Sequence, residues 1–150
     1  MIATERLLAL PAGALAPLVA ESEAVGSALV HRLVAEWESG ANRFDRPGEA
    51  LFGARIDGRL VGVCRLNVDP YAGSARIGRV RHLYVLRSFR QRGVGRRLVR
   101  EVVAAARERF DRLHLRTTSP EAARLYEALG FRRSTEAPHH THTLVLGTEP

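Results

Sequence analysis

Apolar and polar residues alternate along this chain in two rhythms, and each rhythm predicts the element at that place. The apolar stretch from Ile2 to Leu10 predicts a first strand, which Pro11 and Gly13 interrupt. The residues from Ala14 to Ala20 predict a short helix. A longer helix is predicted from about Val25 to Glu38, where apolar residues recur every three or four positions.

The middle of the chain predicts a hairpin followed by a buried strand. Ala50 to Ile56 and Arg59 to Val68 flank Asp57-Gly58, a favoured two-residue turn with positive φ at both positions. The next strand is predicted from Ala75 to Leu86. Its second half, Val80 to Leu86, is β-branched, aromatic and apolar, which is typical of a strand at the centre of a sheet.

The last third of the chain predicts two more helices and three more strands. Val94 to Phe110 carries apolar residues on one helical face, and Arg112 to Thr117 alternates as a strand does. Thr118 or Ser119 is predicted to cap a helix that runs from Pro120 to Gly130. The final strands are expected at Phe131 to Ser134 and Thr141 to Leu146. The order β-α-α-β-β-β-α-β-α-β-β indicates an α+β (mixed α/β) fold with a mixed sheet, and residues 1–150 are expected to form a single domain.

The composition is that of an ordinary globular protein, since 45% of the 150 residues are hydrophobic. No apolar run approaches the roughly 18 residues of a transmembrane helix, so we expect no membrane span. The chain does not begin with a charged leader and a long apolar block, so we expect no secretory signal. The single cysteine, Cys64, has no partner for an internal disulfide, and the cytoplasm is the expected compartment.

The charge of the chain changes this picture, because the formal net charge is +7 and all 23 basic residues are arginine. A positive balance favours anionic partners such as phosphates, nucleic acid or acidic substrates. Solubility alone explains the charge equally well, apart from one glycine-rich loop.

That loop joins the predicted central strand to the next helix. A strand that enters a glycine-rich turn and then a helix forms an anion site, because glycines admit close approach and the first helical amides are free. Two known phosphate loops are excluded: a P-loop needs a lysine, which the chain lacks, and a Rossmann loop needs a glycine where Leu98 stands. The arginines gathered here are Arg87, Arg90, Arg92, Arg96 and Arg97.

The spacing Arg90-x-x-Gly93-x-Gly95 resembles the pyrophosphate loop of the GNAT superfamily of acyl-CoA N-acetyltransferases. A second segment is similar to that family's A-x-x-L-Y-E-x-L-G-F motif, and it consists of Ala122, Leu125, Tyr126, Glu127, Leu129, Gly130 and Phe131. The resemblance covers roughly residues 80 to 131. It implies the GNAT fold, a splayed central sheet of about six or seven strands flanked by about four helices.

The resemblance also implies a function: transfer of an acetyl group from acetyl-CoA to a primary amine by direct attack in a ternary complex, without a metal. Tyr126 matches the family's general acid, which protonates the leaving thiolate. The positions that match cofactor contacts are Leu83, Tyr84, Val85, Arg90, Gln91, Arg92, Gly93, Val94, Gly95, Arg96 and Ser119. Ser119 stands where the family often has asparagine, and it keeps a hydrogen-bonding group.

One position departs from the family. Many members carry a glutamate base on the central strand, and this chain has Arg79 there. A cation cannot accept the amine proton, which leaves three hypotheses: His82 acts as base, a bound water does, or the acceptor has a pKa low enough to need none. The other interpretation of His82 is a strand histidine packed on a helix.

The acceptor is open, and it includes small amines, amino acids, antibiotics, peptide N-termini and protein lysines. By position, the acceptor-pocket candidates are Trp37, Asn42, Arg43, Phe44, Asp69, Pro70 and Tyr71. The histidines His139, His140 and His142 border that region, either as an exposed loop, as acceptor contacts or, least favoured, as metal ligands. Two other functions stay open: a GNAT module that binds acyl-CoA with weak or no transfer, and a basic nucleic-acid-binding protein. The resemblance also raises a homodimer.

Overall fold

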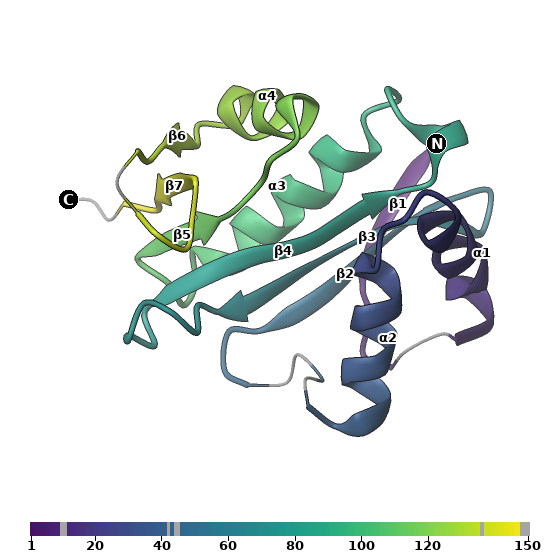
Figure 1. Ribbon diagram of the computed structural model, residues 1–150, viewed down its shortest axis with the longest axis horizontal. Helices are drawn as coiled ribbons and strands as arrows, with labels where there is room; N and C mark the ends of the chain where they lie inside the picture. The colour runs from purple at the N-terminus through teal and green to yellow at the C-terminus, as the bar shows by residue number, and fades with distance from the viewer. Residues whose placement is uncertain (10–11, 42, 44–45, 136, 148–150) are drawn as a thin grey trace.

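The computed structural model describes residues 1–9, 12–41, 43, 46–135 and 137–147. These residues form one seven-stranded mixed sheet, ordered β1-β2-β3-β4-β5-β7-β6, with four α-helices, so the predicted α+β fold is confirmed (Figure 1). The strands are β1 (Ile2–Arg6), β2 (Ala50–Ile56), β3 (Arg59–Val68), β4 (Ile77–Val85), β5 (Arg112–Leu115), β6 (Arg132–Arg133) and β7 (His142–Val145). The helices are α1 (Ala12–Ala24), α2 (Leu29–Ser39), α3 (Val94–Ala106) and α4 (Pro120–Ala128), with one 3-10 turn, η1 (Arg87–Phe89).

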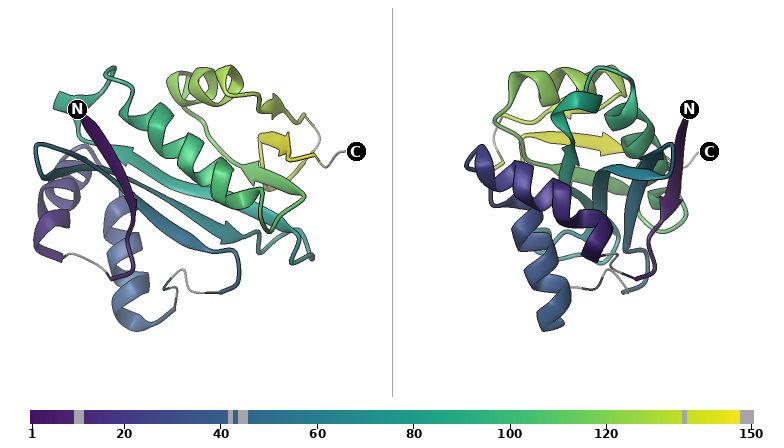
Figure 2. Two further views of the ribbon diagram at one scale, coloured as in Figure 1. Left: turned by 180° about the vertical axis from the view of Figure 1, so that it is seen from behind. Right: turned by 90° about the vertical axis from the view of Figure 1, so that its right-hand side faces the viewer.

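The sheet separates two layers of helix. Helices α1 and α2 pack together on one face, and α3 crosses the other face over β2, β3 and β4 (Figures 1 and 2). Helix α3 buries one apolar stripe against the sheet, made of Val94, Leu98, Val99, Val102 and Ala106. Gly62 on β3 permits this close approach, since a Cβ there would lie 3.1 Å from Leu98 Cδ1. Within the described part of the chain, no helix combines the length and apolar character that a membrane span requires.

The hairpin prediction is confirmed at both strands and at the turn. Strands β2 and β3 have the predicted bounds, and Asp57 (φ 51°) and Gly58 (φ 77°) both adopt positive φ. Such a turn matches the right-handed twist of the flanking strands, so it fixes their register.

The boundary between the first two helices differs from the prediction. Helix α1 continues through Glu21 to Ala24, and the chain then turns at Gly26, whose φ is 79°. Helix α2 therefore begins at Leu29 rather than at Val25, and the Ser27 hydroxyl accepts a hydrogen bond from the Leu29 amide at 3.3 Å. Val25 is consequently exposed.

Strand β1 and helix α3 also end earlier than predicted. Strand β1 stops at Arg6, and Leu10, the predicted end, lies outside the described residues. Helix α3 stops at Ala106 rather than Phe110, because the chain must turn there so that Phe110 packs in the core beside β4.

Strands β4 and β5 run side by side for only a short distance. Their parallel register pairs Ile77 with Arg112, Gly78 with Leu113 and Arg79 with His114, and it extends no further. Strand β4 continues to Val85 with β3 on its other edge. The β3–β4 register also shifts by one residue opposite His82, which has a positive φ of 57°. Strands β4 and β5 therefore diverge as a V at the centre of the sheet, and the bulge between β3 and β4 lies beside it.

We expect the α3 packing to dominate stability. Replacing Leu98, which is fully buried, by alanine removes apolar contacts with the sheet and should lower the free energy of unfolding by about 2–5 kcal/mol. Urea unfolding measures this change. The control is Arg100→Ala on the exposed side of the same helix, expected within about 0.5 kcal/mol of the wild type. Equal losses in the two variants would contradict this account of the core.

Candidate active site

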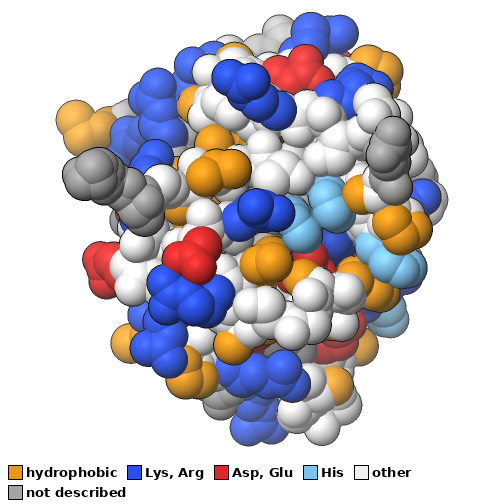
Figure 3. Space-filling view, turned by 90° about the vertical axis from the view of Figure 1, so that its left-hand side faces the viewer, with side chains coloured by type: hydrophobic (Ala, Val, Ile, Leu, Met, Phe, Trp, Pro, Cys, Tyr) orange, Lys and Arg blue, Asp and Glu red, His pale blue; other side chains and the backbone are white. Residues whose placement is uncertain are grey.

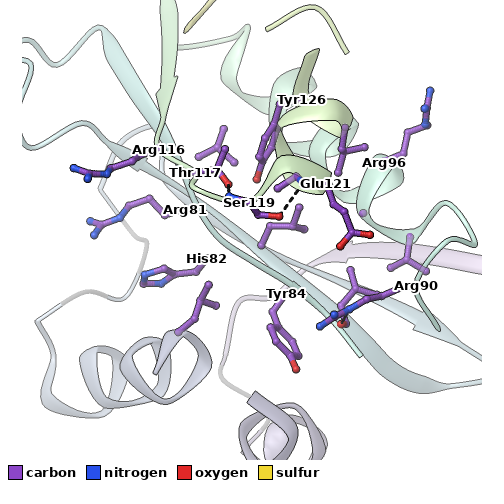
Figure 4. Close-up of a pocket in the computed structure, with 18 of the residues that line it drawn as sticks. Arg81, His82, Tyr84, Arg90, Arg96, Arg116, Thr117, Ser119, Glu121 and Tyr126 are labelled. Carbon is purple, nitrogen blue, oxygen red and sulfur yellow. Dashed lines mark hydrogen bonds between the residues drawn. The ribbon is translucent and has the colours of Figure 1, made fainter. Parts of the chain in front are cut away.

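A cleft of about 940 Å³ occupies the V between β4 and β5 (Figure 4). Strand β4 forms its floor, the loop before α3 closes one end, and the start of α4 forms a wall. The sequence-predicted site residues that line it are His82, Leu83, Tyr84, Val85, Arg90, Gln91, Gly93, Val94, Gly95, Arg96, Ser119 and Tyr126. Arg92 does not line the cleft, because its guanidinium lies over the Phe89 ring, 5.3 Å from the centroid.

The loop before α3 is fastened to the end of β4. Arg90 Nε donates a hydrogen bond to the Val85 carbonyl at 2.8 Å, and its guanidinium lies 5.3 Å from the Tyr84 ring centroid. Gln91 and Gly93 adopt positive φ values of 64° and 87°, which bend the chain into the helix. This loop therefore presents its backbone to the cleft in a defined conformation.

The N-terminus of α3 faces the same end of the cleft. The first intrahelical hydrogen bond runs from the Arg97 amide to the Gly93 carbonyl at 3.0 Å, so the amides of Val94 to Arg96 have no partner within the helix. A Cβ on Gly95 would lie 3.3 Å from Leu125 Cδ2 and 3.9 Å from Leu83 Cδ2. The absence of a side chain there keeps the cleft open between α3, α4 and β4, where free amides and the helix dipole favour an anion.

Tyr126 reaches the cleft from α4. Only 6% of its surface is exposed, its ring meets Phe131 edge-on at 5.5 Å, and its hydroxyl points into the cleft (Figure 4). Burial raises the pKa of Tyr126 above its ordinary value, so the phenol is protonated at neutral pH. Ser119 fixes the start of this helix, since its hydroxyl accepts from the Ala122 amide at 3.2 Å, as the capping prediction required.

His82 is poorly suited to accept a proton. Its Nε2 lies 3.4 Å from the Arg65 guanidinium, which can only donate, so the ring proton belongs on the buried Nδ1. Burial, followed by the charge of Arg65, lowers the pKa of His82 to about 2. Arg65 itself is fully buried and pairs with Glu36 at 2.7 Å. These contacts favour the interpretation of His82 as a packed strand histidine over its interpretation as the base.

The charge of Arg79 is compensated by Asp69 within a network that the sequence did not reveal. Its guanidinium lies 3.6 Å from Asp69 Oδ1, donates to the His139 carbonyl at 2.6 Å and stands over the Tyr71 ring at 5.2 Å. The other oxygen of Asp69 lies 2.7 Å from His114 Nδ1. Asp69 and Tyr71 stand out in the sequence as pocket candidates, but no local pattern links them to a histidine 45 residues away.

Histidine side chains gather on one face of the molecule (Figure 3), and His114 belongs to the last registered pair of β4 and β5, where the V closes. His139 stacks on Tyr71 with ring centroids 4.2 Å apart, and His140 stacks on His114 at 3.8 Å. His142 is separate from them, since it is buried and bonded to Glu127 at 2.8 Å. Among the described residues, no group of three or more His, Cys, Asp or Glu side chains is arranged to hold a metal ion.

Two further acceptor candidates lie on or after α2. Trp37 packs against the core as a half-buried side chain, and Arg43 is exposed and donates to the Trp37 carbonyl at 3.1 Å. Neither residue lines the cleft. Asn42 and Phe44 lie outside the described residues.

Comparison with known proteins gives a consistent set of similarities. Residues 17–131 match the model of the acetyltransferase (GNAT) family. N-alpha-acetyltransferase RimI of Mycobacterium tuberculosis (strain ATCC 25618 / H37Rv) is 37% identical over 94 residues, which cover 58% of this chain. The chain spans about half the length of that relative, 54%.

Solved structures show the same architecture. A presumed acetyltransferase from Exiguobacterium sp. 255-15 superposes with a TM-score of 0.85 at 29% identity, covering 97% of this chain and 93% of its own. YncA of Salmonella typhimurium, a presumed acetyltransferase solved with its cofactor acetyl-CoA, superposes with a TM-score of 0.70 at 16% identity. That match covers 98% of this chain and 96% of the other.

The environment of His82 predicts a pH dependence of stability. The folded protein binds no proton at His82 above about pH 2, whereas the unfolded chain binds one below its ordinary pKa of 6.5. Acidification therefore favours unfolding, and this residue should contribute a loss of about 1.4 kcal/mol per pH unit below about pH 6. Urea unfolding of the wild type and of His82→Gln between pH 7 and pH 5 should show a shallower slope in the variant. Identical slopes would mean that His82 is protonated in the folded state.

Proposed function

This chain belongs to the acetyltransferase (GNAT) family, and from that premise we propose that it transfers an acetyl group from acetyl-CoA to a primary amine by direct attack in a ternary complex. Its seven-stranded sheet with a divergent central pair is the fold of that family. The observation that carries the proposal is the convergence of three elements on one cleft: the unpaired edge of β4, the amides at the start of α3 and the hydroxyl of Tyr126.

The residues present fit the cofactor. Bound acetyl-CoA supplies the acetyl thioester. The amides of Val94 to Arg96, with Arg90 and Arg96, would hold its pyrophosphate, and Gly95 leaves the space that this requires. Among the described residues, the edge of β4 from Leu83 to Val85 has no parallel partner, so its backbone groups, apart from the Val85 carbonyl that Arg90 occupies, would be available to orient the pantetheine arm and polarise the thioester carbonyl. Ser119 lies on the opposite wall of the cleft.

Tyr126 would supply the proton for the leaving thiolate. Its buried phenol keeps that proton at neutral pH, and its hydroxyl is directed into the cleft between the two walls. Apolar side chains, including Phe131 and Leu125, surround Tyr126 and exclude water. They would therefore strengthen a hydrogen bond from the Tyr126 hydroxyl to the leaving thiolate.

The amine would reach the site without a protein base. Arg79 remains a cation and the pKa of His82 is about 2, so neither takes the proton efficiently. An α-amine suits such a site, because roughly a tenth of it is neutral at pH 7, against less than about a thousandth of a lysine side chain. The similarity to an N-alpha-acetyltransferase supports this choice of an α-amino acceptor.

A second candidate is a domain that binds acyl-CoA and transfers the acyl group weakly or not at all. The specific observation in its favour is the same lack of a basic side chain at Arg79 and His82. The two candidates differ in turnover and agree in cofactor binding, so both measurements are needed.

We expect Tyr126→Phe to lower kcat by about 10²-fold, the lower range for loss of a general acid. The ring and its contact with Phe131 stay in place, so the affinity for acetyl-CoA should not change. A thiol-release assay with a peptide acceptor measures turnover, and calorimetry measures cofactor affinity. Unchanged turnover would show that Tyr126 is not the acid.

We expect Gly95→Val to weaken acetyl-CoA binding at least about tenfold, because its side chain would project between Leu125 and Leu83 into the cleft. The matched control is Gly13→Val, since a Cβ at Gly13 on α1 meets no atom within 4 Å. Calorimetric titration of both variants decides the matter. Unchanged affinity in the Gly95 variant would show that acetyl-CoA does not bind at this end of the cleft.

A further inference from the structure

The cleft has a second basic end, which the cofactor loop does not explain. Arg81 and Arg116 both line the cleft, on the side away from Arg90 and Arg96 (Figure 4). Tyr126 and Ser119 lie between the two ends in that view. A phosphate held at the α3 end therefore does not account for the arginines at the other.

These two arginines come just beyond the last registered pair of β4 and β5. The parallel register ends at Arg79 and His114; Arg81 lies two residues later on β4, and Arg116 directly follows β5. Side chains two residues apart in a strand lie on the same face of the sheet, so Arg81 lies on the face that carries Arg79. Two like charges at this end of the cleft repel each other, and an anion bound between them would relieve that repulsion.

The carboxylates of this region are committed elsewhere. Asp69 pairs with Arg79 and His114, and Glu36 pairs with Arg65. Among the described residues that line the cleft, Glu121 is the only carboxylate, and it lies toward the Arg90 end.

Electrostatic coupling also places the arginines in one neighbourhood. Burial lowers the pKa of Arg79, and the charges of Arg81 and then Arg116 lower it further, against the opposing effect of Asp69. Arg81 is half-buried and Arg116 is exposed, so the positive field opens to solvent at the mouth of the cleft. Asp69 compensates the charge of Arg79, so among the described residues that line this end of the cleft, Arg81 and Arg116 carry the remaining guanidiniums.

We propose that Arg81 and Arg116 bind a carboxylate of the acceptor, so that the substrates of this enzyme are α-amines that carry a carboxylate close by. This inference rests on the proposed acetyl transfer, and it names the acceptor class for that site. A guanidinium pair recognises a planar carboxylate through several charge-assisted hydrogen bonds. The carboxylate has two sources: the α-carboxylate of a free amino acid, or an acidic side chain beside a peptide N-terminus.

Two matched pairs of acceptors separate these sources. The first pair is alanine and alaninamide, with KM expressed as the concentration of neutral amine because the α-carboxylate raises the pKa of the alanine amine. The second pair is the C-terminally amidated peptides Ser-Asp-Ala-Ala and Ser-Asn-Ala-Ala. Within at least one pair, the carboxylate-bearing member should have a KM lower by roughly 10- to 100-fold, the usual effect of hydrogen bonds to a charged group. The pair that shows the difference identifies the source.

Three variants test the assignment to these residues. Arg81→Gln and Arg116→Gln should each abolish most of the preference while acetyl-CoA affinity stays unchanged. Arg124→Gln removes one exposed charge from α4, outside the cleft, and should keep the preference. Direct titration of the carboxylate-bearing acceptor into each variant gives a readout that is independent of turnover.

The failures of the two proposals are distinguishable. If acetyl-CoA binds but no acceptor causes release of the CoA thiol, the proposed transfer fails. The titration of the acceptors still tests whether Arg81 and Arg116 bind a carboxylate. If transfer occurs with equal KM within both pairs, or if Arg124→Gln abolishes the preference as fully as Arg81→Gln, the carboxylate site is overturned.

Discussion

The separation of β4 from β5 after the Arg79–His114 pair is the constraint on which the site depends. A strand at the centre of a sheet normally has both edges hydrogen-bonded to neighbouring strands, and here β5 leaves one edge of β4 unpaired beyond Arg79. The bulge at His82 lies on the same stretch of β4, so the strand changes direction where it loses its partner. The starts of α3 and α4 line the cleft that results.

Charge is distributed in that cleft by a simple division. Two carboxylates hold arginines that are part of the folded structure, Glu36 with Arg65 and Asp69 with Arg79. The other arginines that line the cleft, among the described residues, lie at its two ends, where the proposals above put one anion each. The same side chain type therefore supports the fold and, in the proposed function, would bind ligands at the two ends of the cleft.

The order of the elements could be predicted because it follows from local patterns. The Asp57-Gly58 turn, the Ser119 cap and the apolar stripe of α3 each depend on residues that are neighbours in sequence. The cleft residues could be named only through the resemblance to a family. The periodicity of the sequence alone predicts no more than a mixed sheet.

What the sequence could not show depends on contacts between distant parts of the chain. The sequence offers His82 either as a base or as a packed strand histidine, and only the register of β3 against β4 shows Arg65 beside it. The pairing of Asp69 with His114 depends in the same way on which strands are neighbours. The extension of α1 past Glu21 depends on the η1 turn, whose Arg87 amide donates to the Glu21 carboxylate at 2.7 Å.

The exclusive use of arginine has a chemical consequence for a protein that would handle an activated acyl group. Burial lowers the pKa of Arg65 only to about 10, so this guanidinium stays charged at neutral pH. A buried lysine would become a neutral amine, which is a nucleophile, within the same domain as the thioester. Because the chain has no lysine, none of its side chains offers an amine that could be acetylated in place of the acceptor. In the proposed function, this composition would leave the side chains of the protein unacetylated.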